Sequence, residues 1–455
     1  MEKIYIEHEY DVIVCGSGPA GLGAAMSAKI CGADVLLLES SNLPGGVICA
    51  IPWMSINRLL TDGKKRSKAH DALVRHIFKY GKVAAYPYIT DIKDGHSICP
   101  HVEYAELAIY DMLEEAGIDY KMFSPVVDVV KENNIVIGVV VHEKRGNVYY
   151  KGKVVIDATG DGDVAAAAGC EYMEKSEDNG LHMPITLGFS LGGVDKEKFF
   201  AWFNARKTDM TIPNKGNSLG DNTDKSHLRS SFSEDFNEVI FEAEKNKDLY
   251  IAAWYCFLEG SLPGIVGVLH GAWKGQSLES SGINSADMTA ARRNGLKVAV
   301  DLIRILKEFN VPGMENCFLD KVTTNMGVRD TRRIVGEYVL KFEDTQSDNA
   351  FEDTIARKYG FIDANQVFMG TMFQGFSYPY RSLVPKDVDG LLLAGRCGSA
   401  TFIAHAAGKS MGNMMELGVA AGAAAALSIK TGVQPRNVDI TVLRSTLKNE
   451  LEVDL

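Results

Sequence analysis

The beginning of the chain carries the feature that most constrains its fold: a strand, a glycine-rich turn and a helix in immediate succession. The apolar run Asp11–Cys15 is typical of a buried parallel strand, and it leads into Gly16–Gly21, a G-x-G-x-x-G turn. An alanine-rich helix is expected over Leu22–Cys31, and a second strand, Asp34–Leu38, ends at Glu39. This succession predicts a complete βαβ unit of the kind that binds dinucleotides.

Each residue type in this unit has a mechanical reason to be there. Gly16 permits the tight turn, Gly18 lets the backbone approach a pyrophosphate, and Gly21 allows the helix to pack closely on the strand. The helix N-terminus offers N–H groups and partial positive charge to phosphates. Glu39 stands where a carboxylate can accept hydrogen bonds from an adenosine ribose. The alternative, a glycine turn that binds nothing, explains the strand, helix and terminal acid less well.

Composition narrows the class of protein. The 455 residues are too many for one compact core, so two or three domains are expected. The net charge of -11 argues against nucleic acid or an anionic membrane as partner, and no membrane insertion is expected. Because the N-terminus lacks a basic and apolar leader, we expect a cytoplasmic protein. The eight cysteines are scattered without a C-x-x-C pair, which argues against a zinc or iron–sulfur site.

The middle of the chain predicts a change of architecture. An amphipathic helix is expected over 103–117, followed by a three-stranded antiparallel meander between 125 and 150 that leads into a parallel strand over 154–158. Further helices are expected over 232–246, 285–309 and 350–359. Near the C-terminus, a buried strand over 390–395 precedes an alanine-rich helix over 413–430, whose apolar part reads as buried in protein.

Two later segments decide between nicotinamide and flavin cofactors. Val154–Asp161 and Leu391–Arg396 are both apolar strands that end in small residues, and both would bring backbone to the same cofactor. A long FAD molecule held across a discontinuous domain needs such contacts, whereas NAD does not. Gly160–Ala165 also fits G-x-G-x-x-A, but a second strand ending in an acid does not follow it, so we favour a flavin contact over a separate NAD site. Electrons are then expected from a substrate or a partner protein.

These patterns together predict an α/β fold. It consists of a discontinuous, Rossmann-like FAD-binding domain that includes the meander, plus a second α+β domain that binds or caps the substrate. We assign 1–50, 100–170 and 380–455 to the FAD-binding domain, and 51–99 and 171–379 to the substrate and cap region. The residues expected at the cofactor from these patterns are Gly16, Gly18, Pro19, Ala20, Gly21, Glu39, Ser40, Ala158, Thr159, Gly160, Asp161, Gly395 and Arg396.

Almost the whole chain resembles the FAD-dependent oxidoreductases related to fumarate reductase and succinate dehydrogenase flavoproteins, in the branch without an iron–sulfur motif. The segments that carry the resemblance are Gly16–Gly21, Pro44–Gly46, Asp157–Asp163, Asp178–Gly180 with Pro184–Leu187, Gly327–Gly336, Tyr378–Pro385, Leu393–Arg396 and Ser399–Thr401. The resemblance implies further cofactor contacts at Gly45, Gly46, Val127, Gly408, Asn413 and Met414. It also implies that a helix starting near Asn413 points its positive end at the flavin pyrimidine edge. Phe402 departs from the pattern, because relatives often carry His there, so that role is absent or moves to His405.

The candidates for chemistry are His405 and Arg381. His405 lies among small residues that let a ligand approach, and imidazole titrates near neutrality, although a purely structural histidine is an equal alternative. Arg381 follows Tyr-Pro-Tyr and could hold a carboxylate, or form a structural salt bridge. Arg329 and Arg332 could anchor an anionic substrate or pair between domains, and Tyr380 could donate to a substrate oxygen or pack.

The favoured function is an FAD-dependent enzyme that transfers a hydride between flavin N5 and a small organic substrate, by reduction of an activated C=C bond or oxidation of an alcohol or C–H bond. Two other classes stay open. One is an electron-transfer flavoprotein subunit that serves a partner protein, and the other is a flavin monooxygenase. The substrate, the direction of the reaction, the physiological electron donor or acceptor, covalent attachment of FAD and the oligomeric state do not follow from the sequence.

Overall fold

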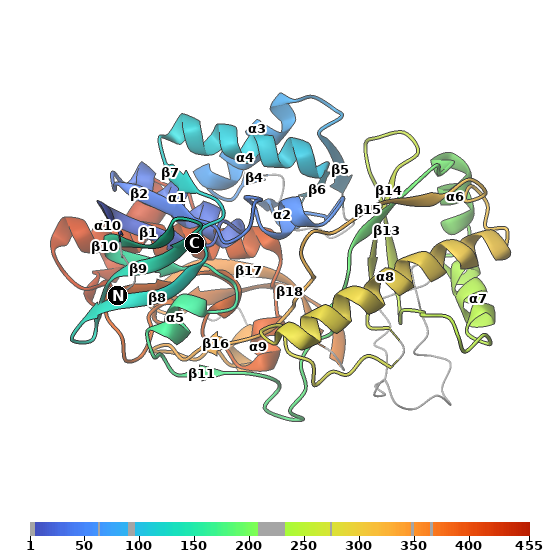
Figure 1. The fold of residues 1–455 in the computed structure, drawn as a ribbon. Helices are drawn as coiled ribbons and strands as arrows, with labels where there is room; N and C mark the ends of the chain where they lie inside the picture. The colour runs from blue at the N-terminus through green and yellow to red at the C-terminus, as the bar shows by residue number, and fades with distance from the viewer. Residues whose placement is uncertain are drawn as a thin grey trace.

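A seven-stranded sheet forms the frame of the protein (Figure 1). The computed structural model describes residues 5–61, 64–89, 96–207, 233–273, 275–346, 350–364 and 367–455. Its main sheet has the strand order β7-β2-β1-β10-β9-β8, with β19 paired to β10. The strands are β1 (Tyr5–Cys15), β2 (Val35–Leu38), β7 (Asp119–Lys121), β8 (Val126–Glu132), β9 (Ile135–Glu143), β10 (Gly146–Asp157) and β19 (Leu391–Leu393).

Strand β10 joins the two parts of this sheet. Its first half pairs antiparallel with β9 and so closes the meander of β8, β9 and β10. Along its length it pairs parallel with β1, and its last residues pair parallel with β19. The expected third meander strand and the expected parallel strand are therefore one continuous strand. This arrangement brings the carboxyl ends of β1, β10 and β19 to one edge of the sheet.

Two helices pack against each other beside the sheet with unusually small separation. They are α1 (Pro19–Ile30) and α10 (Met411–Thr431). A Cβ added to Gly418 would lie 1.8 Å from the Ala20 carbonyl oxygen, and one added to Gly422 would lie 2.1 Å from the Ala24 carbonyl oxygen. Helix α10 is long and apolar enough to cross a membrane by composition, but 89% of its most apolar stretch is buried inside the protein. As the sequence indicates, it is a core helix.

A second sheet lies apart from the first, with its own core (Figure 1). Its antiparallel strand order is β13-β14-β12-β15. The elements of this region are β12 (Phe189–Gly192), α6 (Lys196–Phe203), α7 (Glu234–Ala243), β13 (Tyr255–Glu259), β14 (Val266–His270), α8 (Ser285–Glu308) and β15 (Phe318–Val322). The helices expected over 232–246 and 285–309 are confirmed as α7 and α8.

The helix expected over 350–359 is wrong. The chain forms a hairpin there instead, with β17 (Thr354–Ala364) antiparallel to β18 (Val367–Pro379). Residues such as Ala, Glu, Arg and Lys favour helix locally, but tertiary pairing outweighs that preference. Ile355, Ala356 and Phe376 are buried in the same core as the main sheet, and the buried Glu416 of α10 accepts a hydrogen bond from the Arg357 N–H at 3.0 Å.

The remaining elements are short or cover the main sheet. Helices α3 and α4 lie together on one side (Figure 1), where α4 confirms the helix expected over 103–117. Ile56, Leu73 and Ile98 also belong to the core of the main sheet. The elements are α2 (Val47–Ala50), β3 (Leu60–Thr61), β4 (Lys64–Lys65), α3 (Lys68–Lys79), β5 (Ala85–Ile89), β6 (His96–Pro100), α4 (Val102–Ala116), α5 (Asp163–Ala167), β11 (Tyr172–Met173), β16 (Arg333–Ile334), α9 (Phe402–Ala406), α11 (Ile440–Asn449) and the 3-10 helices η2 (Glu343–Thr345), η3 (Tyr380–Leu383), η4 (Gly395–Cys397) and η5 (Pro435–Asn437).

We predict that Gly418→Ala destabilises the protein although alanine is the better helix former. The intrinsic helix preference favours alanine over glycine by about 1 kcal/mol, but overpacking of a core costs roughly 1–3 kcal/mol. The added methyl group would collide with the backbone of α1, which cannot move aside as a side chain can. Thermal unfolding followed by circular dichroism should show a lower melting temperature. Lys430→Ala, at the exposed end of the same helix, is the control. An unchanged or raised melting temperature for Gly418→Ala would contradict this packing.

Candidate functional site

The glycine-rich turn lies between β1 and α1, and two of its glycines are required by backbone contact. Gly16 has φ of 100°, and a Cβ there would lie 2.4 Å from the Ala158 carbonyl oxygen. A Cβ on Gly21 would lie 1.8 Å from the Gly16 carbonyl oxygen. The turn is therefore locked against the end of β10, which is the second segment that the sequence assigns to the cofactor.

Gly18 differs from both, and it gives a test of whether a pyrophosphate fits. A Cβ added to Gly18 would meet no described atom within 4 Å. Helix α1 starts at Pro19, so the N–H groups of Ala20 and Gly21 have no partner within that helix. Gly46 approaches Gly18 from the other side, and the Gly45 N–H donates to the Ser17 carbonyl at 2.9 Å. Open space, backbone donors and a helix N-terminus suit the phosphates of a dinucleotide.

Glu39 lies at the end of β2, next to the same turn. Its carboxylate accepts hydrogen bonds from the Ser17 N–H at 2.9 Å and the Ser17 hydroxyl at 2.7 Å. Ser40, which is exposed, donates from its hydroxyl to the same carboxylate at 3.2 Å. The Ser124 N–H donates to the Glu39 carbonyl at 2.7 Å, which places the start of β8 and the half-exposed Val127 in the same neighbourhood. The carboxylate is thus held where a ribose would lie beside the pyrophosphate.

The loop after β10 is held by the buried Asp157. Its carboxylate accepts hydrogen bonds from the Thr159 N–H at 3.1 Å, the Thr159 hydroxyl at 2.7 Å and the Ala165 N–H at 2.8 Å. Burial raises the pKa of Asp157 to about 6, and the three donors oppose that rise. A Cβ on Gly162 would lie 2.8 Å from the Ile334 side chain, and α5 has only five residues. The loop therefore packs as a wall of the same site.

The third segment reaches this loop through Arg396. Its guanidinium donates to Asp161 at 2.7 Å and to the Val328 carbonyl at 3.0 Å. A Cβ on Gly395 would lie 2.8 Å from the Ala20 side chain. The turn at Gly16–Gly21, the loop Ala158–Asp161 and the strand end at Gly395 therefore meet, and together they are called the cradle below. Arg332, which the sequence offers as a substrate anchor, donates to the Asp161 carbonyl at 3.0 Å and to Asp163 at 2.8 Å.

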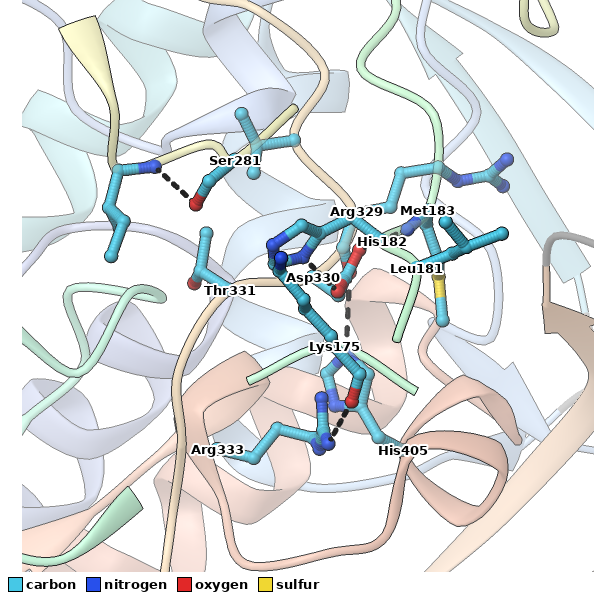
Figure 2. Close-up of polar contacts among 12 residues, drawn as sticks. Lys175, Leu181, His182, Met183, Ser281, Arg329, Asp330, Thr331, Arg333 and His405 are labelled. Carbon is cyan, nitrogen blue, oxygen red and sulfur yellow. Dashed lines mark hydrogen bonds and ion pairs between the residues drawn. The ribbon is translucent and has the colours of Figure 1, made fainter. Parts of the chain in front are cut away.

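Arg329–Thr331, called the linking segment below, connects this cradle to the rest of the site. The Arg329 carbonyl accepts from His405 Nε2 at 3.3 Å. Asp330 accepts from His182 Nδ1 at 2.9 Å and from the Met183 N–H at 2.6 Å (Figure 2). The Thr331 hydroxyl donates to Asp161 at 2.6 Å. Three successive residues thus hold α9, the chain before β12 and the cofactor cradle together.

His405 lies in this site, but it is not a histidine that titrates near neutrality. Burial, and then the positive charges of Arg333 and Lys409, lower its pKa well below the ordinary value. A carbonyl oxygen can only accept, so Nε2 carries the proton in its bond to Arg329. The expectation drawn from the free imidazole therefore fails, because the side chain has left water and faces cations.

Arg333 lies buried next to the linking segment and holds neighbouring segments by hydrogen bonds. It is fully buried and donates to the Ala400 carbonyl at 3.1 Å, the Lys175 carbonyl at 2.7 Å and Glu177 at 2.8 Å. Its guanidinium carbon lies 5.5 Å from the centre of the Phe402 ring. Phe402, where a histidine was expected from the resemblance, therefore packs against the buried Arg333.

The start of α10 is fixed by a buried polar network. The helix begins at Met411, and the Asn413 side chain donates to the carbonyls of Tyr359 at 2.7 Å and Gly408 at 2.8 Å. The Asn413 side-chain oxygen accepts from Arg66 at 2.6 Å, and Arg66 forms a buried ion pair with Glu416. The Met414 N–H bonds to the Ser410 carbonyl at 3.0 Å. This network orients the N-terminus of the helix that the resemblance assigns to the flavin.

Tyr380 and Arg381 have their polar contacts elsewhere. The buried Tyr380 hydroxyl donates to the Pro435 carbonyl at 2.7 Å. Arg381 donates to Asp353 at 3.0 Å and lies over the Tyr338 ring at 5.3 Å, and the hydrogen bond to Asp353 raises its pKa. The structure therefore gives these two residues structural partners, Pro435 and Asp353, that lie outside the linking segment.

Lys358 is a notable residue that the sequence did not single out. It is buried in β17, and its ammonium lies 4.8 Å from the centre of the Tyr378 ring. Burial lowers the pKa of Lys358 to about 7. Its Cβ lies 3.2 Å from the position that a Cβ on Gly408 would take, so it borders the chain before α10. The sequence does not predict that Lys358 is buried, because the segment was expected to be a helix and is a strand.

The eight cysteines are all free thiols, and burial raises the pKa of Cys15, Cys49 and Cys397. Among the residues that the structure describes, no group of three or more His, Cys, Asp or Glu side chains is arranged to hold a metal ion.

The chain belongs to the FAD dependent oxidoreductase family, whose model matches residues 11–447. The protein is therefore an FAD-dependent enzyme, and FAD is the group that the cradle fits.

Two curated relatives match parts of the chain. Digeranylgeranylglycerophospholipid reductase 1 of Methanococcoides burtonii is 26% identical over 210 residues, which cover 44% of this chain and 48% of the relative. Thiamine thiazole synthase of Thermotoga maritima is 29% identical over 145 residues, which cover 31% of this chain and 50% of the relative. The chain thus spans about half the length of the curated relatives it matches.

One solved structure is similar over almost the whole chain. It is a geranylgeranyl bacteriochlorophyll reductase-like protein from Thermoplasma acidophilum, with 15% identity, a TM-score of 0.48 and coverage of 98% of this chain and 85% of that chain.

We predict that Gly18→Ala keeps the fold and loses affinity for FAD. Gly18 has φ of -62° and ψ of 178°, which alanine adopts readily, and its Cβ would enter the space expected for the pyrophosphate. Flavin fluorescence titration should show at least about tenfold weaker binding, which corresponds to about 1.4 kcal/mol. The melting temperature of the apoprotein should stay unchanged. Gly21→Ala, which meets backbone, should fail to fold, and FAD affinity like that of the wild type in Gly18→Ala would contradict the assignment.

We predict that Lys358→Met stabilises the apoprotein near neutral pH. The pKa of Lys358 falls from 10.5 to about 7 on folding, so unfolding takes up a proton between these pH values. In the wild type the free energy of unfolding therefore rises with pH between about pH 7 and 10.5. The amount by which Lys358→Met exceeds the wild type in free energy of unfolding becomes smaller over the same range. Each tenfold change in proton affinity corresponds to about 1.4 kcal/mol. Denaturant unfolding at pH 7 and pH 9.5 measures the difference, and a difference independent of pH would contradict the buried amine.

Proposed function

We propose that this enzyme transfers a hydride between flavin N5 and a small organic substrate, at the junction between the cradle and the second sheet. When bound, FAD supplies a two-electron centre that accepts or donates a hydride. The observation that carries the proposal is the linking segment. It ties the cradle, through Thr331 and Asp161, to two buried histidines, through the Arg329 carbonyl and the Asp330 carboxylate.

The residues of this junction suit substrate chemistry in different ways. His405 is neutral and its Nε2–H donates to the Arg329 carbonyl, so we give it a structural role in holding α9 on the linking segment. Arg329, which is half-buried on the linking segment, is the proposed anchor for an anionic group. Arg332 braces the cradle loop, and Tyr380 and Arg381 hold the C-terminal segments, so we give these three no part in the chemistry.

The relatives favour the reductive direction. One of the two curated relatives is named a digeranylgeranylglycerophospholipid reductase, and this name supports reduction of an organic substrate by the reduced flavin. The comparisons do not show the relationship to fumarate reductase flavoproteins that the sequence suggests. An electron-transfer flavoprotein subunit is one alternative class, and the experiment below distinguishes it from an enzyme that reduces a substrate.

The proposal predicts that reduced flavin in this enzyme is reoxidised by an organic acceptor without oxygen. The holoenzyme is photoreduced anaerobically and mixed with fumarate, crotonate, cyclohex-2-enone, acetophenone and a geranylgeranyl phospholipid, and flavin absorbance is followed. Recovery of the oxidised spectrum with stoichiometric reduction of one compound supports hydride transfer. Free FAD photoreduced in the same way is the control. Reoxidation only by a partner protein, or oxygen-dependent hydroxylation, would replace the proposal with one of the two other classes.

A further inference from the structure

His182 and Asp330 form a buried pair to which the proposed function assigns no role. The His182 side chain is 1% exposed and Asp330 is 2% exposed, and they come from segments separated by 148 residues. One carboxylate oxygen accepts from His182 Nδ1 at 2.9 Å, and the other accepts from the Met183 N–H at 2.6 Å. Because a carboxylate accepts, the imidazole proton resides on Nδ1 in the neutral ring, and Nε2 is left as an acceptor.

The other ring nitrogen has no partner in the part of the chain that the structure describes. His182 Nε2 is buried and makes no hydrogen bond. A buried polar atom without a partner costs roughly 1–3 kcal/mol. In Figure 2 this edge of the ring faces the side on which Ser281 and Thr331 lie. The backbone N–H of His182 donates to the Leu278 carbonyl at 2.7 Å, and a Cβ on Gly282 would lie 2.9 Å from the Thr331 side chain. The linking segment therefore meets the chain between β14 and α8 at this point.

The pair lies beside the cofactor cradle. Asp330, which orients the imidazole, directly precedes Thr331, whose hydroxyl binds Asp161 of the cradle. Met183, which directly follows His182, contacts the Lys409 ammonium through its sulfur at 2.7 Å. Lys409 lies in the loop between α9 and α10, next to the helix N-terminus assigned to the flavin. Charged and titratable residues on the adjoining segments include Arg329, His405, Arg333 and Lys175, which Figure 2 labels, and Lys409.

We propose that His182, oriented by Asp330, is the catalytic residue that exchanges a proton with the substrate during hydride transfer. This inference rests on the proposed function. In the oxidative direction the substrate loses a hydride to the flavin, and its hydroxyl proton passes to Nε2 as the C=O bond forms. In the reductive direction Nε2 first takes up a proton from solvent; one carbon of the double bond then gains the hydride, and its neighbour takes that proton from Nε2. Asp330 keeps Nδ1 protonated and balances the charge of the doubly protonated ring.

His405 cannot share this role in the geometry observed. Its Nε2–H is used by the Arg329 carbonyl, and the cations near it disfavour the doubly protonated ring. His182 Nδ1 instead donates to the Asp330 carboxylate at 2.9 Å, which leaves Nε2 as the nitrogen that can meet a substrate. The two histidines thus differ in the sign of the charges next to them.

The test compares His182→Gln and Asp330→Asn with the wild type, using the panel compound that reoxidises the wild-type flavin. Rapid mixing of the photoreduced holoenzymes across pH 5–9 gives the limiting rate and the apparent dissociation constant. General acid–base groups contribute about 10²–10⁴-fold. We expect a rate at least about 100-fold lower in His182→Gln with an unchanged dissociation constant and unchanged FAD content. Asp330→Asn should lower the rate and shift the pH profile. His142→Gln, at an exposed histidine of β9, is the matched control.

A second readout does not depend on turnover. Nitrogen NMR of the ¹⁵N-histidine-labelled apoprotein should find Nδ1 of His182 protonated and Nε2 unprotonated, with the proton redistributed in Asp330→Asn. A neutral His182 ring that carries its proton on Nε2 and none on Nδ1 in the wild type overturns the inference. Rates and pH profiles equal to those of the wild type in His182→Gln, or in Asp330→Asn if the first variant does not fold, also overturn it while the proposed function stands. Failure of every panel compound to reoxidise the wild type overturns both.

Discussion

The contact between the Gly16 turn and the end of β10 is the constraint on which the rest of the structure depends. The Gly16 and Ala158 backbones lie so close that a single Cβ would collide, and Gly21 closes the same turn from the helix side. This contact can form only if β1 and β10 are parallel neighbours with their carboxyl ends level. It sets the position of the Asp157 loop, and through Arg396 and Asp161 it also sets the position of the last strand.

The linking segment extends this constraint to the chemistry. Backbone and side-chain groups of Arg329–Thr331 hold one histidine by a carbonyl, another by a carboxylate, and the cradle by a hydroxyl. A shift of the cradle would therefore move both histidines. The two rings have different neighbours. His405 faces cations, whereas His182 faces the Asp330 carboxylate and has one nitrogen that meets no partner among the described residues. The hydrogen-bond partners of each ring, and not the identity of the residue alone, therefore separate the proposed proton carrier from the structural histidine.

Local sequence patterns predicted the parts of the structure that depend on local physics. The strand before Gly16, the glycine turn, Glu39 and the buried helix α10 follow from apolar runs and glycine spacing, and the structure has them. The His182–Asp330 pair could not be predicted in this way, because its members are brought together by tertiary pairing across 148 residues. The Lys358 site was hidden by a segment with helix-favouring composition that pairs as a strand. Likewise, the sequence suggests that His405 titrates near neutrality, and only its burial beside Arg333 and Lys409 shows otherwise.

The central claim is that three separated stretches of the chain hold one FAD. The most direct measurement is the flavin content of the purified protein, obtained from its absorbance spectrum and from flavin quantified after the polypeptide is digested completely. The structure predicts about one FAD per chain, bound as the intact dinucleotide, with a spectrum that shifts when the flavin is released. A protein that is colourless, and that binds no flavin when incubated with FAD, would contradict the account.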